Sequence, residues 1–386
     1  MNDEGFGPGN LPYGVDDEGH VLVAWRDEVL DLVHAEGLDV GRDVWASGSL
    51  NAFFDLGPAA WATTRSQLRA VAARQPARAR RRRAGVRLVR PFDVGDVADF
   101  YASREHATNM ATMLRPGQDP LPEAWLHLPI GYHGRAGTVI VSGCDVARPA
   151  GVLRAGEVGP TSRLDVEVEI GFVVGTTVPR GRSVSAAEAD RHIFGVVLVN
   201  DWSARDIQSF EYRPLGPFLG KSFATSVSPW VVPLAALDPW RVPGPRQDPA
   251  PVGYLRQPEP RGLDVRLRLE VNGTPLSTVS SAGLYWSAAQ QLAHLTANGA
   301  GVRAGDLFAS GTISGAERGS EGSLMELTGN GAQPVVLADG SRRSWVADGD
   351  TVTIRGWCEP RGGAPGLSLG EVSSTVVPCG GEVLCR

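Results

Sequence analysis

The sequence predicts a mainly β (α+β) protein built from two domains. The chain has 386 residues, which is more than one ordinary hydrophobic core accommodates. Its 48 Gly and 28 Pro are scattered along the chain and favour many turns joining short strands over long helices. Short apolar or alternating segments recur between these turns, whereas few stretches carry helix signals. The hydrophobic content of 42% and charged content of 21% are those of a globular protein.

The first domain is expected over residues 1–90, as a small β unit closed by a helix. Its elements are two strands and one helix, over residues 20–25, 28–32 and 58–74. Pro58 suits the first turn of this helix, because its missing N–H would have no partner there. The basic run of Arg78 and Arg80 to Arg83 is expected to be a solvated helix end or linker. No aromatic residues interleave with it, as they would in a nucleic-acid site.

The second domain is expected over residues 91–386, as a mostly β domain with a few covering helices. A short capped helix is predicted over residues 93–101, and capping boxes at Ser185 and Ser287 predict two more, ending at Gly195 and near Gly299. Apolar and alternating patterns predict strands over residues 138–141, 164–174, 196–199, 263–271, 306–309 and 351–355.

Composition also limits the classes of protein to which the chain can belong. No apolar run is long enough to span a bilayer, and no signal peptide opens the chain. The net charge of −6 argues against a nucleic-acid surface. The four cysteines form no CxxC pair, so we expect four free thiols in a reducing cytoplasm.

An acidic alternation gives the sharpest chemical signal. A strand has a period of two, so Asp165, Glu167 and Glu169 are predicted to share one face. Two carboxylates about 7 Å apart repel by roughly 2 kcal/mol at an effective dielectric near 20. A solvated face relieves this repulsion, and so does a bound cation; the apolar residues that follow favour the cation. Oxygen ligands without Cys indicate Mg²⁺ or Ca²⁺, with Asp201 and Asp99 as further ligands.

A polar, turn-rich segment over residues 201–225 is the second signal. It contains Lys221, the only lysine in the chain. An ammonium is a compact point charge that Arg does not replace. Arg205, Gln208 and Tyr212 follow Asp201 at offsets of 4, 7 and 11, which predicts one polar helical face suited to substrate contacts.

His106 is the candidate general base, because Asp99 and Tyr101 precede it within one local segment. The remaining histidines are expected to be structural or stay ambiguous: His20, His34, His192 and His294 in the first group, His127 and His133 in the second. The loop at 310–315 and Glu326 carry weak signals of their own. A tight turn and a salt-bridged strand residue explain them equally well.

Taken together, these motifs resemble the fumarylacetoacetase (fumarylacetoacetate hydrolase) family. The resemblance extends from Asn10 to Asp350, and the sequence departs from the family pattern mainly in the loops at 116–117 and 316–322. The segments that carry it are Asp99-Phe100-Tyr101 with Arg104 and His106, and residues 125–135, 165–169, 201–225 and 310–315.

The resemblance implies a fold and an activity. The fold would be a small N-terminal β-barrel of the Src-homology-three type, followed by a large mixed β-roll or sandwich catalytic domain, assembled as a homodimer. The activity would be metal-dependent hydrolysis of a carbon–carbon bond in a small β-diketone dicarboxylate, 4-fumarylacetoacetate. The products would be fumarate and acetoacetate, in the last step of tyrosine and phenylalanine degradation. The cofactor would be Ca²⁺, Mg²⁺ or both, and no nucleic-acid or membrane partner is expected.

The resemblance also implies roles for individual residues. The metal ligands would be Asp99, Glu167, Glu169 and Asp201, with Asp201, the backbone of Lys221, and Thr225 at a second cation site. The catalytic residues would be His106 as base, Glu326 as its orienting partner, and Arg205, Gln208 and Lys221 as stabilisers of negative charge. The substrate contacts would be Tyr101, Arg115, Tyr132, Gln208, Tyr212 and Thr312.

Two alternatives remain open at this point. One is a related diketone or acylpyruvate hydrolase, oxo-acid decarboxylase or isomerase of the same superfamily, although such chains usually lack the N-terminal domain. The other is a non-enzymatic β-scaffold that binds Ca²⁺ structurally. Such a scaffold would need the acidic face but not His106, Arg205, Gln208 and Lys221 together.

Overall fold

The computed structural model describes residues 3–114, 117 and 119–385, and strand β14 (Ile193–Asp201) lies at the centre of the fold. All nine residues of β14 are buried, because both faces of the strand are covered. Val196 and Leu198 belong to the core of the large domain, whereas Val197 and Val199 belong to a core shared with the N-terminal residues. The apolar run that predicts this strand therefore reflects two different packing partners.

Strand β14 belongs to an eight-stranded sheet that carries most of the acidic residues predicted for the site. The strand order is β7-β6-β22-β13-β14-β16-β8, with β17 also paired to β14. Their bounds are β6 Val97–Phe100, β7 Gly131–His133, β8 Val139–Val141, β13 Val168–Val174, β16 Thr225–Val227, β17 Val232–Pro233 and β22 Leu307–Ala309. Most neighbours are antiparallel, but β6 pairs with β22 and β8 with β16 in parallel.

A five-stranded sheet packs against one face of β14. Its order is β21-β20-β25-β26-β9. The bounds are β9 Val146–Ala147, β20 Arg266–Val271, β21 Thr274–Ser280, β25 Thr351–Cys358 and β26 Leu367–Val377. Leu198, Leu267 and Ile354 are fully buried in the same core, so the two sheets enclose one apolar layer. The strands predicted over 263–271 and 351–355 are confirmed as β20 and the longer β25.

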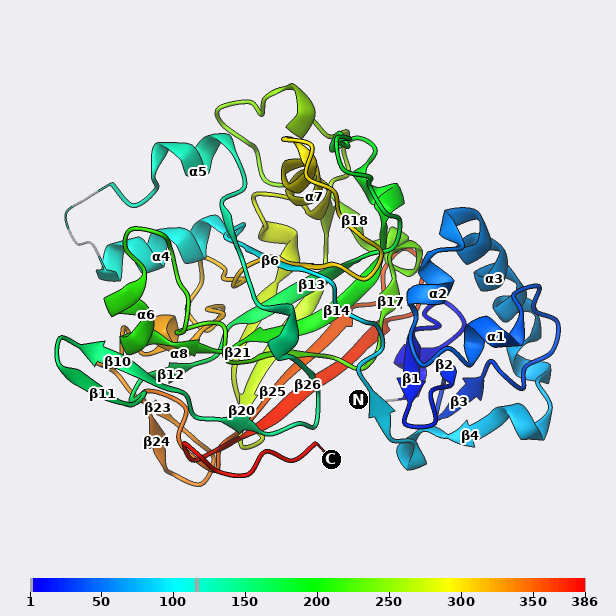
Figure 1. Cartoon of the computed structure of the whole chain (residues 1–386), viewed down its shortest axis with the longest axis horizontal. Helices are drawn as coiled ribbons and strands as arrows, with labels where there is room; N and C mark the ends of the chain where they lie inside the picture. Colours follow the sequence, from blue (N-terminus) through cyan, green and yellow to red (C-terminus); the bar gives the residue numbers. More distant parts are fainter. Residues whose placement is uncertain (1–2, 115–116, 118, 386) are drawn as a thin grey trace.

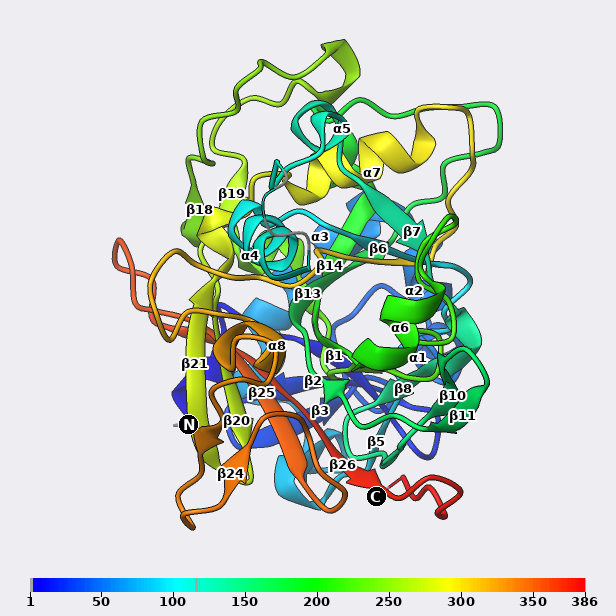
Figure 2. The same cartoon turned by 90° about the vertical axis from the view of Figure 1, so that its left-hand side faces the viewer.

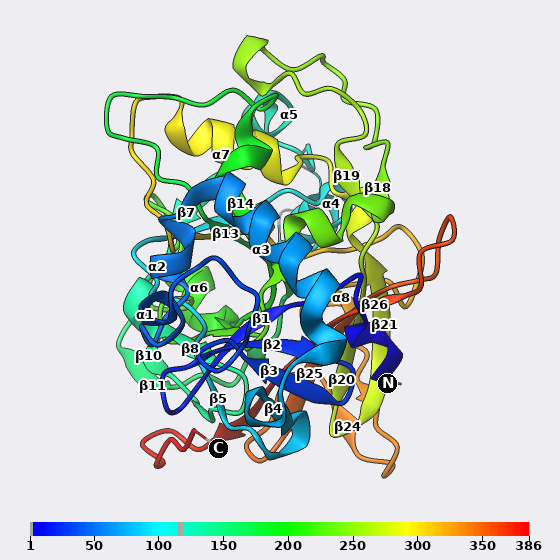
Figure 3. The same ribbon diagram turned by 90° about the vertical axis from the view of Figure 1, so that its right-hand side faces the viewer.

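The N-terminal residues form a separate five-stranded antiparallel sheet, seen at the right in Figure 1 and from its outer side in Figure 3. Its order is β4-β3-β2-β1-β5, with bounds β1 Tyr13–Asp16, β2 Val21–Trp25, β3 Glu28–Asp31, β4 Arg80–Arg82 and β5 Leu88–Val89. Helices α1 (Arg42–Trp45), α2 (Asn51–Phe54) and α3 (Gly57–Val71) cover it. Within the described residues β4 and β5 do not pair, so the sheet does not by itself establish a Src-homology-three barrel.

The helices of the large domain lie around its sheets, with α4, α5 and α6 at the left of Figure 1 and α7 near its top, and Figure 2 views them from that left-hand side. They are α4 Arg104–Leu114, α5 Glu123–His127, α6 Arg205–Glu211, α7 Ala288–Thr296 and α8 Leu324–Leu327. The predicted capping box of α7 is confirmed, because Ser287 and Gln290 each accept a hydrogen bond from the other's backbone N–H. Four strand pairs complete the domain: β10 (Ala150–Arg154) with β11 (Glu157–Pro160), β12 (Leu164–Asp165) with β15 (Ser203–Ala204), β18 (Arg241–Val242) with β19 (Gly262–Leu263), and β23 (Val335–Val336) with β24 (Arg342–Arg343).

Two predicted helices are wrong, and pairing between distant segments explains both. Residues 97–100 form strand β6, because β22 and β7 flank them on the two sides. The capping box at Ser185 leads only to a turn and the short 3-10 helix η6 (Ala189–His192). Gly195 lies inside β14, where an added Cβ would come within 2.4 Å of the Val232 carbonyl oxygen. This glycine serves close strand packing and does not end a helix.

The acidic alternation is not one uninterrupted strand. The strand breaks between β12 and β13, at Val166 and Glu167. Asp165 therefore turns away from the other acids: its carboxylate accepts hydrogen bonds from the Arg205 side chain and the Leu324 backbone N–H. The sequence correctly predicts buried acids in this stretch, but Asp165 does not join the acidic cluster.

The basic run is a strand and not a linker. Residues 80–82 form β4 at the edge of the N-terminal sheet, paired with β3. Arg80 pairs with Glu28, Arg81 with Asp16 and Arg82 with Asp27. The acids that neutralise these three arginines thus come from β3, from β1 and from the turn before β3.

The prediction of four free thiols is wrong for two of them. Cys144 and Cys385 form a disulfide, although 241 residues separate them in the sequence. A β-bridge between the two residues brings them side by side, which sequence spacing does not indicate. Cys358 is a buried thiol and Cys379 an exposed one.

In the part of the chain that the structure describes, no helix has both the length and the apolar character required to cross a membrane.

Asp350 provides a test of the C-terminal sheet, because its buried carboxylate anchors the turn before β25. It accepts two hydrogen bonds from Arg343, at 2.8 and 2.9 Å, and others from Asn272 and Ala347. Burial opposes ionisation, but the Arg343 hydrogen bond holds the pKa of Asp350 below its usual value. We expect Asp350→Asn to lower the free energy of unfolding by about 1–3 kcal/mol in urea at pH 7.

The exposed Asp348, paired with Arg148 at 2.6 Å, provides the control. Asp348→Asn should change stability by less than about 0.5 kcal/mol. A lowered folded pKa stabilises only above the unfolded pKa, so the difference between wild type and Asp350→Asn should shrink below about pH 4. An equal loss in both variants, or a pH-independent difference, would contradict this account.

Candidate active site

Four buried carboxylates converge where the strands of the eight-stranded sheet end. Asp99 comes from β6, Glu169 from β13 and Asp201 from the last position of β14, while Glu167 lies just before β13. Each offers an oxygen, and these four oxygens all lie within 4.8 Å of one another. The strand pairing explains this convergence: Asp99 lies opposite Ala309 of β22, and the Asp201 N–H donates to the Glu167 carbonyl at 3.3 Å.

Two buried cations hold part of this acidic cluster together. The Lys221 Nζ donates to Asp201 Oδ2 at 2.6 Å and also bonds Glu167. The Arg205 guanidinium donates to Glu167 Oε1 at 2.6 Å and to Asp165 Oδ2 at 2.8 Å. Glu167 is thus held from both sides, and breaking such a buried pair by removing one partner typically costs about 3–5 kcal/mol.

The pKa shifts divide the four acids into two kinds. Burial alone would raise the pKa of Glu167, but Arg205 and Lys221 hold it well below its usual range. By contrast, burial, reinforced by the neighbouring carboxylates, raises the pKa of Asp99 and Glu169 well above the usual range. Burial would also lower the pKa of Lys221, but Asp201 and Glu167 raise it above its usual range.

The cluster fits a divalent cation. Asp99 Oδ1 and Glu169 Oε1 are buried side-chain oxygens without a hydrogen-bond partner in the described residues. Leaving a buried polar atom unpaired typically costs about 1–3 kcal/mol, so a cation between these oxygens would remove a real penalty. Four carboxylates against two side-chain cations leave an excess of negative charge, and an all-oxygen donor set suits a hard divalent ion.

His106 lies on α4 beside the cluster and pairs with Glu326 of α8. The His106 Nδ1 lies 2.7 Å from Glu326 Oε2, and both side chains are nearly fully buried. Burial opposes ionisation of Glu326, but His106 and further hydrogen bonds lower its pKa. An ionised Glu326 only accepts hydrogen bonds, so the hydrogen of this contact is on His106 Nδ1, which leaves Nε2 as the ring nitrogen not engaged by Glu326. Glu326 lies in helix α8, so it is not the strand residue that the sequence alone allowed.

Three further side chains fix the Glu326 carboxylate. Asn109 donates to Oε1 at 2.9 Å, while Ser314 and Ser323 donate to Oε2 at 3.0 and 2.8 Å. None of these three residues is predicted from the sequence as part of the site. Two signals were present: Asn109 lies one helical turn after His106, and Ser323 precedes Glu326 with capping-box spacing.

A cavity of about 410 Å³ is lined both by His106 and by Asp99 and Glu167 of the acidic cluster. The predicted site residues that line it are Asp99, Tyr101, His106, Tyr132, Glu167, Arg205, Gln208, Tyr212, Lys221 and Thr312. Arg205 and Gln208 are tied together by a 3.1 Å hydrogen bond from Nη1 to Oε1. The predicted helical face is corrected in one respect: Asp201 ends β14, and α6 begins only at Arg205. Arg115 lies outside the described residues.

The loop after β22 closes one side of this cavity. Gly311 has a φ of +72°, and an added Cβ would lie 2.0 Å from the Phe100 carbonyl oxygen. Only glycine fits there without moving the backbone. The next residue, Thr312, is buried with an unpartnered hydroxyl in the described residues, and it lines the cavity.

A smaller cavity of about 170 Å³ reaches the same cluster from another side. It shares Asp99, Tyr132 and Lys221 with the larger cavity and adds Asp201 and Thr225. Thr225 Oγ1 donates to Asp201 Oδ1 at 3.1 Å, and the Tyr132 hydroxyl donates to Asp201 Oδ2 at the same distance. The carboxylates therefore separate two cavities.

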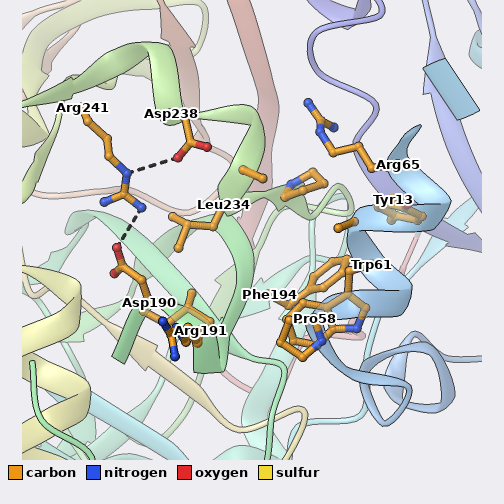
Figure 4. A pocket seen from close by; sticks show the side chains of 14 residues that line it. Tyr13, Pro58, Trp61, Arg65, Asp190, Arg191, Phe194, Leu234, Asp238 and Arg241 are labelled. Carbon is orange, nitrogen blue, oxygen red and sulfur yellow. Dashed lines mark hydrogen bonds and ion pairs between the residues drawn. The ribbon is translucent and has the colours of Figure 1, made fainter. Parts of the chain in front are cut away.

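A third cavity, of about 270 Å³, lies between α3 and the large domain (Figure 4). Its floor is apolar and includes Trp61 and Phe194. Arg241 at its edge is paired with Asp190 at 2.9 Å and with Asp238 at 3.2 Å. The buried acidic cluster and the His106–Glu326 pair lie elsewhere, so this cavity takes no part in the candidate site.

Within a mainly β fold, a buried histidine–glutamate pair lies beside an acidic cluster that fits a cation. This arrangement is typical of enzymes that activate water next to a metal. The sequence matches the family model described as "Fumarylacetoacetate (FAA) hydrolase C-terminal" over residues 96–377 and "Fumarylacetoacetase N-terminal" over residues 9–92. The chain therefore belongs to the fumarylacetoacetase family.

Several fumarylacetoacetases are similar in sequence to this chain over nearly its whole length. The chain is 42% identical to the fumarylacetoacetase of Homo sapiens, with 97% of each chain covered. It is 41% identical to that of Caenorhabditis elegans, over 96% of each chain. It is 38% identical to that of Arabidopsis thaliana, over 98% of this chain and 97% of the relative.

Solved structures share the fold at low sequence identity. A fumarylacetoacetate hydrolase from Exiguobacterium antarcticum matches with a TM-score of 0.59 at 18% identity, covering 96% of this chain and 99% of the other. A maleylpyruvate hydrolase from Sphingobium sp. SYK-6, in complex with manganese(II) and pyruvate, matches with a TM-score of 0.56 at 17% identity, covering 95% and 99%.

The unpaired oxygens of the cluster lead to a prediction about cation binding. For the metal-free protein, adding Mg²⁺ or Ca²⁺ should raise the midpoint of thermal unfolding, by the equivalent of about 2.7 kcal/mol at 100 times the dissociation constant. Glu169→Gln should be more stable than wild type without metal, because it removes the free-energy cost of burying this carboxyl among other acids, the cost that raises its pKa. It should also lose most of the cation-induced shift.

The matched control is Glu123→Gln, at an exposed position in α5. This variant should behave as wild type both with and without the cation. An unchanged cation-induced shift in Glu169→Gln, measured by differential scanning calorimetry, would show that the cation binds elsewhere.

Proposed function

We propose that this protein hydrolyses 4-fumarylacetoacetate to fumarate and acetoacetate in a metal-dependent reaction. The observation that carries the proposal is that His106, paired with Glu326, lines the same cavity as Asp99 and Glu167 of the acidic cluster. The names of the similar full-length proteins support the same substrate. This reaction would be the last step of tyrosine and phenylalanine degradation.

His106 is the general base in this mechanism. Its Nε2 takes a proton from water, and the resulting hydroxide attacks the carbonyl carbon on the fumaroyl side of the diketone. Glu326 stabilises the imidazolium that forms, because its ionised carboxylate accepts the Nδ1–H. Asn109, Ser314 and Ser323 keep that carboxylate in place during the proton transfer.

Arg205, Gln208 and Lys221 are the donors for the negative charge that develops in the transition state. All three line the cavity, and the two cations are already fixed by the buried acids. Preorganised donors of this kind need no reorganisation during the reaction, and losing one typically costs about 10²–10³ in rate. When the intermediate collapses, the carbon–carbon bond breaks and its electron pair leaves with acetoacetate as an enolate, which then takes up a proton.

Asp99, Glu167, Glu169 and Asp201 would hold the metal, which we propose to be Ca²⁺ or Mg²⁺ because every donor is a hard oxygen. When bound, such an ion supplies Lewis-acid polarisation of the diketone oxygens. Asp201, Thr225 and the Lys221 backbone would serve a second cation from the smaller cavity.

Tyr101, Tyr132, Tyr212 and Thr312 would contact the substrate, since all four line the larger cavity, and Gln208 would contribute from α6. Arg115, which follows α4, would bind a terminal carboxylate. Its guanidinium would suit one end of a dicarboxylate substrate.

The remaining expectations concern the organisation of the protein. We propose a small N-terminal β-barrel domain of the Src-homology-three type over residues 1–90 and a catalytic domain over residues 91–386. A homodimer is supported by exposed apolar side chains near the cavity, namely Phe210, Leu215, Phe218 and Leu219. We also propose cytoplasmic localisation, which the free thiols of Cys358 and Cys379 favour and the Cys144–Cys385 disulfide does not.

Purified protein should cleave fumarylacetoacetate when Mg²⁺ or Ca²⁺ is present. The measurement is loss of the ultraviolet absorbance of the diketone together with fumarate detected by chromatography. His106→Gln should lower kcat by about 10²–10⁴, because the base is lost. Chelation of the metal should abolish turnover, and re-adding the ion should restore it.

The cation-induced thermal shift of His106→Gln should match that of wild type, which separates loss of the base from loss of the metal. Absence of turnover by wild type with either ion would refute the proposed substrate. Full activity of His106→Gln would refute only the assignment of the base.

Lys221→Arg tests the need for a point charge. Lys221 is buried between Glu167 and Asp201, and a planar guanidinium cannot occupy that position without moving one of them. We expect kcat to fall by about 10²–10³, as for a lost oxyanion donor. Arg135→Lys, the reverse exchange at a residue of the smaller cavity, should keep most of the activity. Near-normal kcat in Lys221→Arg would show that any cation suffices.

A further inference from the structure

The N-terminal sheet carries a second cluster of metal-ligating side chains, remote from the candidate active site. His20 lies just before β2, Asp31 ends β3, and His34 follows in the next turn. The Nδ1 atoms of His20 and His34 each lie 3.0 Å from the same oxygen, Asp31 Oδ2. The proposed function uses none of these residues, and the sequence analysis treats both histidines as structural.

We propose that His20, Asp31 and His34 form a binding site for a divalent transition-metal ion of the Zn²⁺ type. Two imidazoles and one carboxylate are the donor set that suits such an ion, in contrast to the all-oxygen cluster of the candidate active site. The two sites would therefore select different metals.

The distance from each imidazole nitrogen to the carboxylate oxygen is close to that between two ligands of a tetrahedral site. Zinc bonds of 2.0–2.1 Å place two ligand atoms about 3.3 Å apart. Both histidine–aspartate distances are 3.0 Å, so a small outward movement of the ligands would admit the ion. The two imidazole rings are inclined at 59° with centroids 5.7 Å apart, so both approach Asp31 Oδ2 without stacking on each other.

Accessibility differs among the three side chains in a way that favours binding from solvent. Asp31 is buried at 5% exposure, whereas His20 and His34 are exposed by 22% and 44%. The carboxylate is also held in place, because its second oxygen accepts the Val33 N–H at 3.0 Å. A fixed anion below two accessible imidazoles leaves an open side for a fourth ligand, such as water.

The net charge of the side chains around Asp31 favours the binding of a cation. Arg81 lies 3.7 Å from Asp31 Oδ2, but its guanidinium is hydrogen-bonded to Asp16. Asp16 also accepts the His20 N–H at 2.8 Å and so fixes the turn between β1 and β2. Glu18 in that turn adds a further carboxylate near His20. Asp16 offsets the charge of Arg81, which leaves Asp31 and Glu18 to attract the ion.

A bound ion would join the start of β2 to the end of β3 and the following turn. Leu22 of β2 already pairs with Asp31 of β3, so the ion would close the end of this hairpin. Its expected consequence is a more stable N-terminal sheet, without any direct part in the reaction.

The test is Zn²⁺ binding to the full-length protein by equilibrium dialysis, with Mg²⁺ in large excess to occupy the acidic cluster. Wild type should bind one Zn²⁺ that His34→Gln and His20→Gln bind at least tenfold more weakly. His127→Gln, at an exposed histidine of α5, is the matched control and should bind as wild type. Replacing Zn²⁺ by Co²⁺ should give wild type the visible absorption of a low-coordinate nitrogen-containing site, and His34→Gln should lose it.

Equal Zn²⁺ affinity in wild type and both cluster variants would overturn the proposal, as would a Co²⁺ spectrum that the His34→Gln change leaves untouched. The variants must retain the Mg²⁺-supported activity of wild type, which confirms that they are folded. If they do not, a measurement on wild type decides: absence of Zn²⁺ binding under excess Mg²⁺ overturns the proposal.

Discussion

Glu167 is the charge on which the rest of the site depends, because it is buried and must remain ionised. Arg205 and Lys221 hold it from opposite sides, and each of these cations reaches a further acid, Asp165 or Asp201. This chain of ion pairs ties β12, the start of β13, the end of β14 and helix α6 to one another. Burying charges is costly unless every member is paired, so each of these segments is constrained by its neighbours. The break in the acidic strand at Glu167 is part of the same arrangement, since it lets Asp165 serve Arg205.

Sequence patterns predict those elements whose packing is uniform along their length. The apolar run of β14 and the capping box of α7 are local signals, and both elements are present in the structure. Sequence patterns fail where pairing with a distant segment determines the structure. Residues 97–100 become a strand because β22 and β7 lie beside them. The Arg80 to Arg82 run becomes an edge strand because it pairs with β3 and because Glu28, Asp16 and Asp27 neutralise its charges. The Cys144–Cys385 disulfide depends on an encounter across 241 residues, which no spacing rule contains.

The candidate site was predictable in its residue types, and less so in its geometry. Carboxylates on an apolar strand and a single lysine indicate unusual chemistry without any structure. Physical reasoning from the sequence did not pair His106 with Glu326, because 220 positions separate them; the resemblance to a family supplied that pairing. Asn109, Ser314 and Ser323 escaped both approaches. They act through Glu326, and nothing in a lone sequence shows which carboxylate needs fixing.

The acidic cluster has one cavity on each side, and this has a consequence for the order of events in a catalytic cycle. The larger cavity holds the histidine base, while the smaller one reaches Asp201 and Thr225 without passing it. A cation held by these carboxylates would therefore border both cavities. An ion that reached Asp201 from the smaller cavity would not need the larger one to be free of organic molecules. Because Asp99 and Lys221 line both cavities, however, the ion and the substrate would still influence each other through these shared contacts.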